Sequence, residues 1–130
     1  MKLEIPFALP GLNEYVNAER THRQLGGQFK RRHQAAVVAA LRGQIRRPLR
    51  EPVYCRYLWV ERDRRRDKDN IAAFGRKVIQ DALVQMGALR NDGWGGIAGF
   101  MDEFAVDRCR PRIEIEIEED CETWQEQDKT

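Results

Sequence analysis

Seven residues near the end of the sequence alternate strictly between apolar and charged side chains. Arg112–Glu118 reads RIEIEIE, with an isoleucine at every second position. Successive side chains of a β-strand point to opposite faces, so this pattern predicts a strand with one buried and one solvated face. The rest of the chain must therefore supply elements that cover the isoleucine face.

Three further segments are predicted to be strands. Leu3–Phe7 alternates between apolar and polar or small residues. Val53–Val60 (VYCRYLWV) is apolar on both faces and rich in β-branched and aromatic residues, as expected of an inner strand. Phe100–Val106 is predicted to form a hairpin with Arg112–Glu118 across the turn at Arg108–Pro111.

Two segments carry apolar residues at helical spacing. Phe29–Gly43 predicts an amphipathic helix of about four turns, with basic side chains facing outward. Ile71–Met86 predicts a second helix, which Gly87 terminates. Asn13–Gly27 has little periodicity and is predicted to be an irregular loop. The order β-α-β-α-β-β predicts an α+β domain, a mixed sheet with two main helices packed on one face.

The length of 130 residues fits one domain. We expect it to span residues 1–118, followed by an acidic tail at 119–130 that frays, with Trp124 as one docking contact. No apolar run approaches the roughly 20 residues of a membrane helix. Residues 1–10 are too short and too mixed for a signal peptide. The expected location is therefore the cytoplasm, without a membrane partner.

The residue types present exclude several enzyme classes. The sequence contains no serine, so it cannot build a Ser-His-Asp hydrolase. Cys55, Cys109 and Cys121 form no C-x-x-C pair, which argues against a zinc ribbon or a disulfide framework. Gly93–Ala98 fits G-x-G-x-x-A, but no strand precedes it and no long helix follows. We therefore expect no organic cofactor.

Charge is strongly segregated along the sequence. Between Arg20 and Arg50 there are nine basic residues and no acid, whereas eight acids follow Ile113. Such segregation favours the binding of a polyanion, such as nucleic acid, to one face of the protein. This binding would weaken steeply with added salt. The alternative is a helix whose basic side chains are merely solvated.

The segment between the inner strand and the second helix holds the most informative motif. Asp67 and Asp69 stand two residues apart, so in extended backbone their carboxylates point the same way, an arrangement that suits Mg²⁺. The alternative is that Asp69 or Asn70 caps the helix. A third carboxylate, Asp92, follows the helix and reaches the same edge only if the chain turns back, and Asp-Gly is also a common turn.

With these residues identified, the chain resembles the RusA family of Holliday junction resolvases, which are found largely in phages and prophages. The resemblance runs from about Lys2 to Glu118. It rests on D-x-D-N at Asp67–Asn70, on D-A-L at Asp81–Leu83, on Gly87 and on Asn91-Asp92. Pro10-x-x-Asn13 and Arg20 are similar to the opening segment of the family.

The resemblance implies a homodimeric, Mg²⁺-dependent endonuclease, with Mn²⁺ as a substitute, that cuts four-way DNA during recombination and repair. Asp67, Asp69 and Asp92 match the metal-binding aspartates. The usual lysine position is Ala73 here, and Lys77 one turn later either replaces that lysine or forms a surface pair with Asp81. The candidate DNA-binding residues are Arg20, Arg23, Lys30, Arg31, Arg32, Arg46, Arg47, Arg64, Arg65, Arg66 and Arg76.

Two other functions compete with a nuclease. A non-catalytic DNA-binding accessory protein would use the basic surface alone, with the aspartates serving as caps and turns. A Mg²⁺ phosphatase with an aspartate nucleophile fits poorly, because Ile71 follows the D-x-D-N motif where such a site needs a nearby hydroxyl or lysine.

Overall fold

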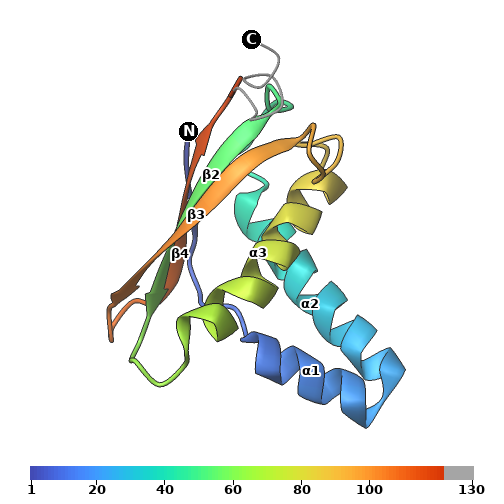
Figure 1. Ribbon diagram of the computed structural model, residues 1–130, viewed down its shortest axis with the longest axis vertical. Coiled ribbons are helices and arrows are strands. Elements are labelled where there is room, and N and C mark those ends of the chain that lie inside the picture. The colour runs from blue at the N-terminus through green and yellow to red at the C-terminus, as the bar shows by residue number, and fades with distance from the viewer. Residues whose placement is uncertain (122–130) are drawn as a thin grey trace.

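The helices lie on one side of a four-stranded mixed sheet, and no helix of residues 1–121 covers the other face (Figure 1). The computed structural model describes residues 1–121. In chain order the elements are β1 (Lys2–Ile5), α1 (Leu12–Thr21), α2 (Arg23–Leu41), β2 (Val53–Glu61), α3 (Lys68–Gln85), β3 (Ile97–Val106) and β4 (Arg112–Glu118). The predicted α+β class is confirmed. Within residues 1–121, no helix has the length and apolar character needed to cross a bilayer.

The strand order in the sheet is β1-β4-β2-β3, so the predicted hairpin between the last two strands is wrong. β4 pairs antiparallel with β2 and β1, whereas β3 pairs parallel with β2 at the edge. The predicted inner position of β2 is confirmed. The strict isoleucine row of β4 must be covered, which favours an inner position, while the half-exposed side chains of β3 tolerate an edge.

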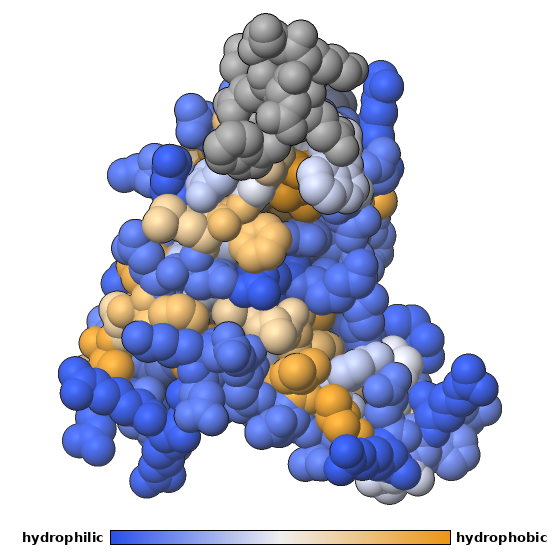
Figure 2. Space-filling model, viewed as in Figure 1, coloured by the Kyte–Doolittle hydropathy of each residue, from blue (hydrophilic) through white to orange (hydrophobic). Residues whose placement is uncertain are grey.

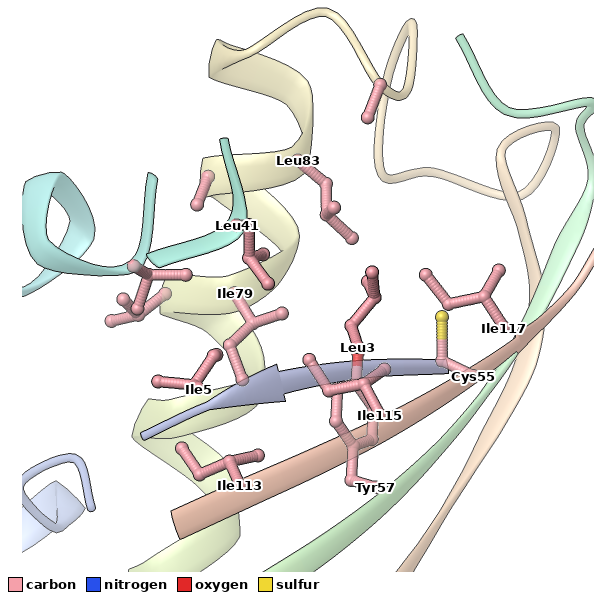
Figure 3. Close-up of a cluster of buried hydrophobic side chains, with 14 of the residues drawn as sticks. Leu3, Ile5, Leu41, Cys55, Tyr57, Ile79, Leu83, Ile113, Ile115 and Ile117 are labelled. Atoms are coloured by element: carbon pink, nitrogen blue, oxygen red, sulfur yellow. The ribbon is translucent and has the colours of Figure 1, made fainter. Parts of the chain in front are cut away.

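The alternation in β4 builds the core as predicted. Ile113, Ile115 and Ile117 are each at most 2% exposed. They point, together with Cys55 and Tyr57 of β2, toward the helices (Figure 3). Side chains of α2 and α3 complete the layer from the opposite side, among them Leu41, Ile79 and Leu83. The core therefore holds α3 directly over the central strands.

The segment expected to be an irregular loop is helical. α1 occupies most of it, and α2 begins at Arg23, where the side chain of His22 accepts a hydrogen bond from Gln24 N. The reason lies in contacts between the two helices. A Cβ added at Gly26 would lie 2.4 Å from Cγ of Glu19, so this glycine permits close helix packing rather than ending the helix.

α3 forms where predicted and ends at a glycine in the left-handed region, because Gly87 has a φ of +76°. Its middle packs tightly on β2. A Cβ at Gly75 would lie 2.5 Å from the Trp59 ring, and the Trp59 indole donates a hydrogen bond to Asp102 of β3. α3, β2 and β3 are thus joined at the centre of the sheet.

The two oppositely charged stretches of the sequence meet in space. Both terminal nitrogens of the Arg47 guanidinium, Nη1 and Nη2, donate hydrogen bonds to Glu119, at 2.7 and 2.8 Å, and Arg50 contacts Asp120. Glu119 and Asp120, assigned to a fraying tail, therefore pack against the segment before β2. The remaining tail residues 122–130, including Trp124, lie outside the described residues. Part of the basic stretch is consequently neutralised within the protein.

Replacing Glu119 by glutamine is expected to remove a pH-dependent contribution to stability. Hydrogen bonds from Arg47 lower the pKa of Glu119 from 4.5 to about 2. The ion pair therefore stabilises the fold above pH 4.5, and its contribution disappears as the pH falls toward 2. In urea unfolding, the stability gap between wild type and Glu119→Gln should close over that range.

Glu116→Gln is the matched control for this prediction, because Glu116 is exposed on β4 and forms no ion pair with any of residues 1–121. Its stability difference from wild type should stay small at every pH. A gap for Glu119→Gln that does not change between pH 5 and pH 2 would contradict the expected role of this pair.

Candidate metal and nucleic-acid site

An open cleft of about 990 Å³ lies where β2 leads into α3. Asp67 immediately precedes α3 and Asp69 lies in its first turn; both are exposed and both line the cleft. Neither carboxylate forms a hydrogen bond or an ion pair with any of residues 1–121. The structure thus places two of the three predicted metal ligands on the lining of one cleft, with their oxygens unengaged by residues 1–121. The extended backbone expected between them is wrong, because α3 begins at Lys68 and Asp69 is helical.

Capping of α3 does not explain the D-x-D-N motif. Asp67 occupies the N-cap position, but its side chain accepts no capping hydrogen bond. Asn70 instead turns to the preceding helical hairpin, where its Oδ1 accepts a hydrogen bond from Asn13 N in the first turn of α1, at 2.8 Å. A Cβ at Gly11 would lie 2.6 Å from the Asn70 side chain. Asn70 is therefore a structural link between α1 and the aspartates.

Asn70→Ala is expected to destabilise the fold by about 1 kcal/mol, because it removes the acceptor that caps α1. Asn70→Asp keeps an oxygen at the same place and should retain most of the stability. Denaturant unfolding of both variants provides the measurement. Equal losses in the two variants would mean that the hydrogen bond to Asn13 contributes nothing.

The arginine cluster before Asp67 has two different roles. Arg66 is largely buried and donates to Glu61 at 2.6 Å and to the Leu9 carbonyl at 3.1 Å, while it also contacts Glu14. Through these contacts it links the loop to β2 and α1, and it also lines the cleft. Arg64 is exposed at the cleft and makes no ion pair within residues 1–121.

Asp92 lies apart from the other two aspartates in the protomer. Its carboxylate accepts a hydrogen bond from Lys77 Nζ at 3.1 Å, and Lys77 also contacts Asp81 at 3.2 Å. Lys77 is eight residues beyond Asp69, or about 12 Å along the helix. Residues 1–121 contain no group of three acidic, histidine or cysteine side chains placed to hold a metal ion.

Lys77 and Asp81 form a small charged network at this point of α3. Hydrogen bonds that Lys77 donates to Asp92 and Asp81 raise the pKa of Lys77. Partial burial raises the pKa of Asp81, but hydrogen bonds from Lys30 and Lys77 outweigh it, so the pKa lies below its ordinary value. The surface pair of Lys77 with Asp81 is therefore present. Lys30 of α2 also forms an ion pair with Asp81 and so links α2 to α3.

The remaining predicted DNA-binding residues divide into engaged and available side chains. Arg76 pairs with Asp102 and stacks over Phe100, Arg65 lies 3.7 Å from Asp63, and Arg47 pairs with Glu119. Those that form no ion pair with any carboxylate of residues 1–121 are Arg20, Arg23, Arg31, Arg32, Arg46 and Arg64. Most of these available charges belong to the α1–α2 hairpin or the segment after it.

Sequence reasoning missed the contribution of β3 to the cleft. Phe104 and Val106 line it beside the aspartates, and Lys68 Nζ lies 5.6 Å from the Phe104 ring centroid. Glu61, which holds Arg66, was also missed. No local signal reveals these residues, since β3 reaches the cleft only through its parallel pairing with β2.

No protein-family model matches the chain, and a search of curated proteins gives no match either. The resemblance to the RusA family therefore stays a prediction that rests on the motifs of the sequence.

Proposed function

We propose that the protein is a Mg²⁺-dependent, structure-specific endonuclease that resolves four-way DNA junctions by paired nicks. The observation that carries the proposal is a pair of carboxylates, Asp67 and Asp69, that line an open cleft together with Arg64. None of these three side chains forms an ion pair with any of residues 1–121. The two carboxylates line the same cleft, where their like charges favour a cation between them. A phosphodiester is the substrate class that suits both a cation and arginine.

The donor set of the cleft fits magnesium. Mg²⁺ is usually held by one or two carboxylates, by water and by substrate phosphates rather than by a complete protein cage. Asp67 and Asp69 would hold it here, and Mn²⁺ would substitute because its ligand preferences are similar. When bound, the ion would orient water and neutralise charge developing on the scissile phosphate. Arg64 would hold a neighbouring phosphate without reading the base sequence.

A second copy of the chain would bring a third carboxylate to each cleft. β3 is an edge strand of ten residues and carries three exposed large apolar side chains, Phe100, Met101 and Val106. Figure 2 shows apolar side chains interrupting the charged surface in this part of the molecule. Long exposed edges of this kind are normally covered or paired.

Antiparallel pairing of two β3 strands about a twofold axis supports a shared site. β2 and β3 are parallel, so Asp67 lies toward the end of the sheet at which β3 finishes, whereas Asp92 precedes the start of β3. Reversing β3 in the second copy carries the partner's Asp92 toward Asp67. The resulting dimer has two equivalent clefts, which suits a substrate that is itself approximately twofold symmetric.

The basic hairpin would supply the remaining affinity for DNA. Arg20, Arg23 and Arg31 lie on exposed positions of α1 and α2, and α1 begins at the wall of the cleft. Contacts of these side chains with phosphates position a duplex and weaken steeply with added salt. A duplex arm lying along the hairpin would therefore run directly away from the cleft.

A cleavage assay tests the proposal. A labelled synthetic four-way junction and a matched linear duplex are incubated with the purified protein in Mg²⁺, in Mn²⁺ and in EDTA. We expect paired symmetric nicks in the junction with either metal, no nicks in EDTA and an intact linear duplex. Junction binding that is indifferent to Mg²⁺, without nicking, would favour the DNA-binding accessory protein instead.

A further inference from the structure

The loop between α3 and β3 (Figure 1) carries Trp94, whose side chain is exposed to solvent. It is 74% exposed, more than any other large apolar side chain of residues 1–121. It forms no aromatic or cation–π contact with these residues. Exposing an indole costs free energy, and nothing within the described chain offsets that cost.

The turn that carries Trp94 is well fixed. Gly96 N and Ile97 N both donate to the Gly93 carbonyl, at 3.1 and 3.0 Å, and Gly93 N donates to the side chain of Asn91. A Cβ at Gly96 would lie 2.1 Å from the Asn91 carbonyl oxygen, so only glycine fits there. The loop is therefore a tight turn that holds the indole outward.

The surroundings of Trp94 indicate the chemistry of its ligand. Asp92, two residues earlier, is bonded to Lys77, and the exposed Arg90 forms no ion pair with any of residues 1–121. A flat apolar ring and an available positive charge on the same loop suit a flat aromatic group attached to an anion. Nucleobases in single-stranded or unstacked DNA have this chemistry, and tryptophan binds them by stacking.

We propose that Trp94 stacks on an unpaired or unstacked base of the DNA substrate, beside the cleft of the other subunit in the proposed dimer. This inference rests on the proposed function. Bases within a continuous duplex are stacked on one another and cannot accept the indole, whereas bases at a branch point can. Trp94 is thus a residue that selects branched over linear DNA.

Equilibrium binding in Ca²⁺, followed by fluorescence anisotropy, tests the role of Trp94 without cleavage. Trp94→Ala should weaken binding to a four-way junction by roughly 5- to 100-fold and leave binding to a linear duplex unchanged. Trp94→Phe, which keeps an aromatic ring, should retain most of the affinity. Leu25→Ala is the matched control, since Leu25 is an exposed apolar residue on α2 and is 45% exposed.

Substrates with abasic sites next to the branch point identify the stacking partner. On such junctions the wild type and Trp94→Ala should bind equally, because the base that stacks is missing. A wild type that binds and nicks intact junctions no better than Trp94→Ala would overturn this inference and leave the proposed function standing. Loss of the dimer in Trp94→Ala would also overturn it, and a wild type that binds no DNA would overturn both.

Discussion

Asp67→Asn is expected to lower the rate of junction nicking in Mg²⁺ by about 100-fold or more, while junction binding in Ca²⁺ is retained. The Asp67 carboxylate lines the cleft, forms no capping hydrogen bond and pairs with none of residues 1–121, so its removal costs the fold little. Its expected contribution is to hold the ion that stabilises charge in the transition state, and losing such stabilisation has effects of this size.

Asp63→Asn is the matched control for this variant. Asp63 lines the same cleft and carries the same charge, but its Oδ1 accepts the Arg65 backbone N–H, a role that asparagine retains. A general electrostatic effect would slow both variants equally, whereas a metal-ligand role affects Asp67→Asn far more. Undiminished cleavage by Asp67→Asn would remove the metal site from the proposal.

Mixing Asp67→Asn with Asp92→Asn is expected to restore nicking that neither variant has alone. If Asp67 of one subunit acts with the partner's Asp92, each mixed dimer contains one cleft with both carboxylates intact. Random exchange makes half of the dimers mixed, so the nicking rate should recover to about a quarter of the wild-type value. These products should be mostly single nicks.

A site contained within one subunit predicts the opposite result. Each subunit would then lack one ligand regardless of its partner, and the mixture would stay as inactive as its components. Refolding the two variants together from denaturant ensures exchange, and size-exclusion chromatography confirms the dimer. The restored rate is therefore a direct test of the shared cleft, independent of whether Trp94 contacts DNA.

The sequence predicts the elements of this fold better than their arrangement. The isoleucine row of β4 and the helical spacing of α3 are local patterns, and both elements lie where those patterns place them. The predicted pairing of β3 with β4 is wrong, because adjacency along the chain does not decide strand order when β2 can pair on both edges. α1 was missed because its stability comes from contacts such as Tyr15 stacking on Phe74.

The candidate site likewise has a part that the sequence predicts and a part that it does not. Asp67 and Asp69 are neighbours in sequence, so their common location could be predicted. The position of Asp92 depends on where α3 returns the chain, and the neutralisation of Arg47 depends on Glu119, far away in sequence. Residue spacing in the sequence carries no information on either contact. The sequence alone therefore could not show that only part of the basic stretch is available to a ligand.

The contact between Asn70 and the start of α1 has a mechanical consequence. Because Asn70 packs against Gly11 and accepts the Asn13 N–H, the start of α1 is tied to the loop that carries the aspartates. The cleft cannot widen by hinging the hairpin away without breaking this contact. Any deformation needed to fit a branched substrate would then fall on the nucleic acid, and flexible, easily kinked base steps would be favoured.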